Sequence, residues 1–167
     1  IARSLREAHR LDVIHRDLKP GNVLLTQHGD EDDFAKVLDF GLVKHVETEG
    51  QQELTKAGLF MGSPKYMSPE QIRGDHVDAR CDIYALGVMI YQMITGQLPR
   101  GVWKPPSQRA EIDPGWDDIV GHAMQSDPAD RYQKASEIKT DVSRITPPCR
   151  ASVSDAKAGK PDARPAE

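Results

Sequence analysis

The sequence contains few of the features that mark specialised protein classes. Its 167 residues include only two cysteines, Cys81 and Cys149, which lack metal-site spacing, so we expect no disulfide framework and a reducing, cytoplasmic setting. Aromatic residues make up 5% of the chain and the formal net charge is −4, and both values argue against a nucleic-acid partner. The longest apolar run, ALGVMIY, is too short to cross a membrane, so we expect no membrane span in this chain.

The overall composition is that of an ordinary globular domain with one hydrophobic core. Hydrophobic residues make up 38% of the chain and charged residues 29%. Apolar spacing predicts helices over residues 1–12, 82–96, 116–125 and 135–145. Two apolar runs, NVLLT and FAKVLDF, flank a polar connection and predict a β-hairpin. The sequence therefore predicts a mainly α fold with a small β-hairpin.

The two ends of the chain and one long internal stretch differ from these elements. Helical spacing begins at Ile1 with no preceding methionine, so we expect the chain to be a fragment that starts inside a helix. Residues 42–67 are polar without a clear period, and a connection of that length is usually functional or mobile. Residues 146–167, rich in Pro, Ala, Lys and Asp, are predicted to be a disordered tail or linker. The predicted domain covers residues 1–145.

Three short motifs occur in order along this domain: HRDLKPGN at residues 15–22, DFG at 39–41 and SPE at 68–70. Each motif alone fits an ordinary explanation, such as a solvated turn or a strand-ending turn. Together, in this order, they are specific. The combination resembles the C-terminal lobe of the protein kinase family, and the resemblance extends from the first residues to about Ile145. It implies the helical lobe of the α+β kinase fold, catalytic loop and activation segment included.

Nothing in the sequence resembles the N-terminal lobe of that family. The Gly-rich loop that covers the phosphates, the strand lysine and its helical glutamate partner are all missing from the 167 residues. We therefore expect the N-terminal lobe to be a missing partner of this chain. Because half of the ATP cleft is then lacking, we expect the isolated fragment to bind ATP poorly and not to phosphorylate.

The spacing of the polar residues suits phosphoryl transfer from ATP, with Mg²⁺ or alternatively Mn²⁺ as the metal. Asp17 would orient the incoming hydroxyl and accept its proton, and Lys19 would lie beside the γ-phosphate of bound ATP. Asn22 and Asp39, joined by the hairpin, would supply oxygen ligands to the metal and so help bind ATP. The resemblance adds Leu24 as part of the floor beneath the adenine.

The resemblance also indicates the acceptor. Lys19 lies two residues after Asp17, which resembles the serine/threonine-specific branch of the family. The stretch GSPKYMSPEQ at residues 62–71 resembles the peptide-docking loop of that branch. Ser63 lies where members usually carry a threonine whose hydroxyl bridges the catalytic aspartate and lysine, and a turn serine before Pro64 is the alternative. The implied partner is a protein substrate with a Ser or Thr acceptor.

Other residues have architectural roles in the resemblance. Glu70 and Arg131 match a buried family ion pair, and Asp82 matches the acid that holds the backbone of the catalytic loop. His15 and Phe40 resemble members of the family's stacked apolar spine, with ordinary core packing as the alternative, and Gly41 is expected to have a structural role.

Arg16, directly before the catalytic aspartate, indicates regulation. In the family this arginine is linked to control by phosphorylation of the long loop, because a phosphate pairs well with arginine and can order a segment. Thr55 is the preferred acceptor, with Thr48 second, and we expect autophosphorylation there in the complete enzyme.

The segments LPRGVWKPPSQ and MSPEQIRG are most similar to bacterial members of the family, particularly multidomain ones. Many of these face the cytoplasm and are tethered by a membrane helix, so an untethered cytoplasmic protein and the cytoplasmic part of an anchored kinase both stay open. We interpret the chain as part of a bacterial-type serine/threonine protein kinase. The alternative is a non-catalytic kinase-like fragment that acts as a binding module. The predicted site retains all four of its charged and amide residues, which argues against that alternative; they are Asp17, Lys19, Asn22 and Asp39.

Overall fold

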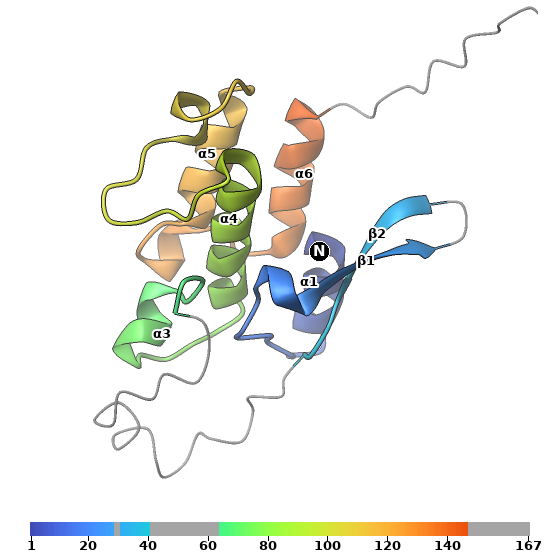
Figure 1. Ribbon diagram of the computed structural model, residues 1–167. Helices are drawn as coiled ribbons and strands as arrows, with labels where there is room; N and C mark the ends of the chain where they lie inside the picture. The colour runs from blue at the N-terminus through green and yellow to red at the C-terminus, as the bar shows by residue number, and fades with distance from the viewer. Residues whose placement is uncertain (29–30, 41–63, 147–167) are drawn as a thin grey trace, which may run out of the picture.

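The computed structural model describes residues 1–28, 31–40 and 64–146 (Figure 1). Within these ranges the chain forms five α-helices and one two-stranded sheet, the mainly α architecture with a small hairpin that the sequence predicts. The helices are α1 (Ala2–His9), α3 (Pro69–Arg73), α4 (Arg80–Thr95), α5 (Gly115–Ala123) and α6 (Ala135–Ile145). The strands are β1 (Val23–His28) and β2 (Glu31–Val37), and short 3₁₀ turns cover Pro20–Asn22, Pro106–Gln108 and Pro128–Asp130.

Helix α4 is the centre of the hydrophobic core (Figure 1). Every residue from 81 to 91 is buried apart from Tyr84, and a helix without a polar face must be covered on all sides. Helix α5 packs against α4, α6 packs against α5, and α1 packs against α6, so the helices form one continuous body. Helix α4 is capped by Gly96, directly after its last residue, and the φ of 69° at Gly96 is the left-handed conformation that glycine adopts without a Cβ clash.

The hairpin projects from this helical body (Figure 1). Strands β1 and β2 pair antiparallel, with Val23 opposite Val37 and an irregularity between Thr26 and His28. Strand β2 begins at residue 31, three residues before the apolar run that predicts it, because backbone pairing extends into the acidic stretch. Leu24 and Leu25 are 51% and 65% exposed, so the side chains of both leucines are open to solvent.

Two local differences from the sequence prediction lie next to the motifs. Helix α1 ends at His9 rather than at residue 12, and Asp12 has a φ of 55°, a left-handed conformation that aspartate tolerates better than most residues. The apolar spacing does not predict the short helix α3. This helix has Ser68 as its N-cap residue and Pro69 at its first position, and Gly74 caps its C-terminal end.

Part of the predicted organisation lies outside the described residues. This holds for residues 41–63 of the long polar connection and for the predicted tail from residue 147 onward. In the part of the chain that the structure describes, no helix is both long enough and apolar enough to span a membrane.

Candidate active site

The turn that follows His15 brings three polar side chains of the HRDLKPGN motif together. Lys19 Nζ lies 2.5 Å from Asp17 Oδ2, and the two side chains are 29% and 31% exposed. Asn22, at the end of the 3₁₀ turn, donates from Nδ2 to the Asp17 carbonyl oxygen at 2.7 Å. This bond fixes the Asn22 amide so that Nδ2 faces the protein backbone, and Oδ1 is the atom left for another partner. A carboxylate, an ammonium group and an amide oxygen are therefore held in one partly open cluster.

Asp39 is attached to the same cluster through its two neighbours in the chain. Leu38 donates its backbone N–H to the Asn22 carbonyl at 2.8 Å, and the Leu38 carbonyl lies 2.8 Å from His15 Nε2. On the other side, the ring of Phe40 packs edge-on against His15 with centroids 5.0 Å apart. Asp39 itself is exposed and has a φ of 59°. The DFG motif thus begins beside the HRDLKPGN motif although 17 positions separate Asn22 from Asp39.

Asp82, at the start of α4, holds the backbone just before Asp17. Its Oδ2 accepts the His15 N–H at 2.9 Å and its Oδ1 accepts the Arg16 N–H at 2.8 Å. The Asp82 side chain is buried, as is that of His15. The neighbouring Cys81 is a free cysteine, and burial together with the Asp82 carboxylate raises the pKa of its thiol, so it stays protonated.

Two contacts at this loop involve residues that sequence reasoning missed. His9 Nε2 lies 2.8 Å from Asp82 Oδ2, which links the end of α1 to α4. Gln71 Nε2 donates to the Arg16 carbonyl at 2.7 Å, which links α3 to the loop at residues 15–22. The Ser-x-x-Gln spacing at residues 68–71 is a signature of a helix start and could have located α3. No sequence signal pairs either residue with a partner more than 50 positions away.

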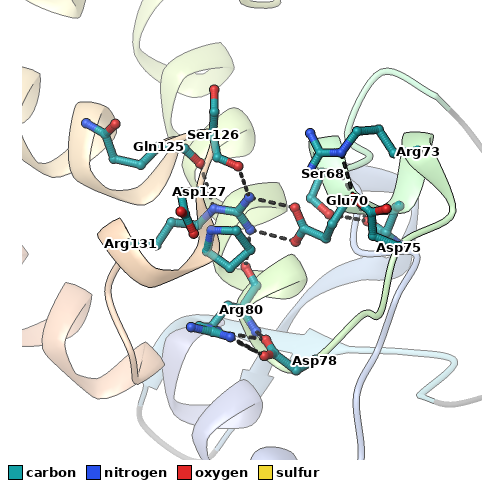
Figure 2. Close-up of polar contacts among 12 residues, drawn as sticks. Ser68, Glu70, Arg73, Asp75, Asp78, Arg80, Gln125, Ser126, Asp127 and Arg131 are labelled. Atoms are coloured by element: carbon teal, nitrogen blue, oxygen red, sulfur yellow. Dashed lines mark hydrogen bonds and ion pairs between the residues drawn. The ribbon is translucent and has the colours of Figure 1, made fainter.

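Glu70 and Arg131 form a buried ion pair between α3 and the turn before α6 (Figure 2). The guanidinium donates to both carboxylate oxygens, at 2.7 and 2.6 Å. It also donates to the carbonyl oxygens of Gln125, Ser126 and Arg80. Burial by itself would raise the pKa of Glu70, but the hydrogen bonds from Arg131, from the Glu70 backbone N–H and from Ser68 outweigh it, together with the positive charge of Arg131, and leave the pKa lowered. The pair anchors α3 to the helical core.

Two residues at the cluster carry oxygen atoms of the type that fits a magnesium ion. Asn22 Oδ1 and the exposed Asp39 carboxylate are hard oxygen ligands, the type that Mg²⁺ prefers. Among the described residues no group of three or more His, Cys, Asp or Glu side chains could hold a metal. Two protein oxygens suit Mg²⁺, because this ion usually keeps waters and substrate phosphates as its other ligands.

Several predicted site residues are not placed. Ser63, Thr48, Thr55 and Gly41 lie outside the described residues. Their expected roles stay predictions. Leu24 is placed on β1, where its side chain is 51% exposed.

Comparison with known proteins identifies the family. The family model of the protein kinase domain matches residues 1–156 of this chain. The chain is 39% identical over 160 residues to serine/threonine-protein kinase pkn3 of Myxococcus xanthus, which covers 85% of this chain and 29% of the relative. It is 34% identical to serine/threonine-protein kinase PknB of Mycolicibacterium smegmatis, over 85% of this chain and 24% of the relative. The chain therefore spans less than a third of the length of these curated relatives.

Solved structures share the fold. The kinase domain of Mycobacterium tuberculosis PknI matches with a TM-score of 0.65 and 28% identity, over 87% of this chain and 52% of that domain. A family match over nearly the whole chain, relatives that are bacterial serine/threonine kinases and a shared fold lead to one conclusion: this chain belongs to the protein kinase domain family.

Proposed function

We propose that this chain provides the catalytic residues of a serine/threonine protein kinase, which transfers the γ-phosphate of ATP to Ser or Thr hydroxyls of proteins. One observation carries the proposal. Asp17, Lys19 and Asn22 form a hydrogen-bonded cluster, and the strand that leads to Asp39 is bonded to the same loop. This arrangement supplies the parts that phosphoryl transfer needs from a protein, which are positioning groups and opposite charges.

Each residue of the cluster has a distinct proposed task. Asp17 orients the acceptor hydroxyl and takes its proton at a carboxylate oxygen. Lys19, now paired with Asp17, places its ammonium where negative charge develops on the transferred group. Asn22 and Asp39 would hold the magnesium ion through oxygen atoms. The metal, when bound with ATP, neutralises charge on the phosphates.

Substrate choice is proposed to depend on the segment before α3. Lys19 and the stretch at residues 62–71 support a serine or threonine acceptor, with the Ser63 hydroxyl bridging Asp17 and Lys19. The relatives that carry the name serine/threonine-protein kinase support the same acceptor class. Phosphorylation of Thr55, recognised by Arg16, is the proposed means of regulation, and phosphopeptide mapping of active protein tests it.

We propose further that residues 1–145 form the helical lobe of the kinase domain and that a separate N-terminal lobe completes the ATP cleft. The chain spans only about half of a solved kinase domain, 52% in the case of PknI. Leu24 and Leu25 also leave apolar surface open on the hairpin, where adenine and a second lobe would cover it. On this proposal residues 1–167 alone do not phosphorylate.

A phosphotransfer assay tests the proposal. The N-terminal kinase lobe of the Myxococcus xanthus relative is placed before Ile1, and the chimera is incubated with Mg²⁺, radiolabelled ATP and a protein substrate. We expect Mg²⁺-dependent label on serine and threonine and none on tyrosine. A folded chimera that binds ATP without transferring label would favour the alternative, a kinase-like binding module.

A further inference from the structure

Arg16 has a backbone conformation that is unfavourable for a residue with a side chain. Its φ of 66° lies in the left-handed region, where the Cβ of an L-residue approaches its own backbone. Such a conformation persists only when the surroundings fix it on more than one side. Because Arg16 directly precedes Asp17, the conformation of the Arg16 backbone helps to set the direction of the Asp17 side chain, which lies beside Lys19.

The Arg16 peptide groups are fixed from two different helices. Asp82 of α4 accepts the Arg16 N–H at 2.8 Å, and Gln71 of α3 donates to the Arg16 carbonyl at 2.7 Å. The two side chains therefore hold both polar backbone groups of the strained residue. Asp82 holds the Arg16 N–H, in the peptide group shared with His15, and Gln71 holds the Arg16 carbonyl, in the peptide group shared with Asp17.

The start of α3 determines which end of the Gln71 amide faces Arg16. Gln71 Oε1 accepts from the Ser68 backbone N–H at 3.0 Å and lies 3.1 Å from the Ser68 hydroxyl oxygen. These bonds occupy the oxygen, so the NH₂ group is the end that reaches the loop. The adjacent residue, Glu70, is locked to Arg131. The position of Gln71 is thus set by a helix that is itself anchored in the core.

We propose that Gln71 is a positioning residue, which transmits the placement of the peptide-docking segment to the catalytic loop by holding the Arg16 carbonyl. The inference rests on the proposed function, because it takes Asp17 as the group that meets the acceptor hydroxyl. Residues 64–67 lead directly into α3, so a change in how they bind a peptide shifts Ser68 and, with it, Gln71. When Gln71 keeps its hydrogen bond to the Arg16 carbonyl, the backbone at Arg16 stays fixed, and when Gln71 moves away, this backbone is loosened.

Hydrogen exchange of the 167-residue chain tests this link without nucleotide or activity. The backbone N–H groups of residues 15, 16 and 17 all donate to side chains, to Asp82 or to His15 Nδ1. Gln71→Glu keeps the oxygen that caps α3 and is a residue favoured at that capping position, but it removes the donor. We expect these three amides to exchange about tenfold faster in Gln71→Glu, while the amides of α4 keep their wild-type rates.

A second variant and a control separate the lost donor from other effects. Gln71→Met adds no negative charge near Asp17, but it removes the capping oxygen together with the donor. The loss of the donor is therefore the change that the two variants share, and both should give the same acceleration. Arg73→Gln changes an exposed side chain on the same helix and should leave the three amides at wild-type rates. The proposal is wrong if Gln71→Met exchanges like the wild type at residues 15–17, or if the acceleration extends equally into α4.

Kinetics of the chimera give an independent result. Loss of a positioning contact should lower kcat about tenfold in Gln71→Met and leave the KM for ATP unchanged, because Asn22 and Asp39 keep their places. If the chimera transfers no phosphate at all, the proposed function fails, whereas the exchange experiment still reports whether Gln71 holds the loop.

Discussion

At the scale of single residues, the site depends on backbone conformations that are rare outside glycine. Arg16 and Asp39 both have positive φ angles, 66° and 59°. Each conformation costs on the order of 1 kcal/mol for a residue with a Cβ. A hydrogen bond to Asp82 fixes the backbone of Arg16. Asp39 directly follows Leu38, whose backbone is fixed by hydrogen bonds to His15 and Asn22. No sequence pattern could predict these angles, because tertiary contacts impose them against local preference.

The two carboxylate–arginine pairs of α3 should differ in their effect on stability. Glu70→Ala leaves the buried Arg131 guanidinium without its counter-charge and should lower the free energy of unfolding by about 3–5 kcal/mol. Asp75→Ala removes the partner of Arg73, whose ion pair is more than half exposed, and should cost less than about 1 kcal/mol. Urea unfolding followed by circular dichroism measures both. An equal decrease in the free energy of unfolding for both variants would show that the burial of the Glu70–Arg131 pair does not affect stability.

At the scale of elements, long periodic segments are predictable from the sequence and short ones are not. Helices α4 and α6 lie where their apolar spacing predicts them, because their faces carry the signal over several turns. The five residues of α3 are too few to show a period, and only its capping residues mark it. The early end of α1 depends on the turn at Asp12, which leads the chain toward Asp82.

Two glycines on adjacent helices should respond to alanine in opposite directions. A Cβ at Gly87 of α4 would lie 2.8 Å from the Cβ of Ala123 and 2.9 Å from Cγ of Met124. Gly87→Ala should therefore destabilise the α4–α5 contact by about 1–3 kcal/mol, even though alanine favours the helix. Gly121 of α5 has nothing within 4 Å of an added Cβ, so Gly121→Ala should stabilise by about 0.5–1 kcal/mol.

Urea midpoints of the two glycine variants and of the wild type give the comparison. Both substitutions add the same methyl group to a helix interior, so the difference between them reports the packing of α4 on α5. A stabilised Gly87→Ala variant would contradict the close approach of these helices.

At the scale of the whole molecule, the identity of the site residues is easier to predict than the contacts that hold them. The motifs at residues 15–22 and 39–41 are enough to propose Asp17, Asn22 and Asp39 as site residues, because these residue types suit the phosphoryl transfer that we propose. The contacts of His9 and Gln71 bridge more than 50 positions of sequence, and side chains of those types occur in many places without such a role. Only the packing of α1 and α3 against the catalytic loop reveals them.

The isolated chain should bind ATP weakly. Residues 1–167 supply the proposed metal ligands and the hairpin but no Gly-rich loop to enclose the phosphates, so we expect a Kd in the millimolar range or weaker. Titration calorimetry with ATP and Mg²⁺ measures it, and the chimera with an N-terminal lobe should bind at least about tenfold more tightly. Micromolar binding by the isolated chain would refute the proposal that half of the cleft lies elsewhere.

The central claim is that Asp17 is the group that meets the acceptor hydroxyl, and one substitution tests it most directly. Asp17→Asn keeps the size of the side chain and its place beside Lys19 but removes the base. The control is Asp12→Asn, the same change at an exposed position where asparagine also tolerates the left-handed backbone.

The measurement is the rate of phosphate transfer to serine and threonine by the chimera and its two variants, at saturating ATP and Mg²⁺. We predict that Asp17→Asn lowers kcat by at least about a hundredfold, with ATP binding retained, and that Asp12→Asn keeps the wild-type rate. An Asp17→Asn variant that transfers phosphate as fast as the Asp12→Asn control would contradict the assignment of the active site.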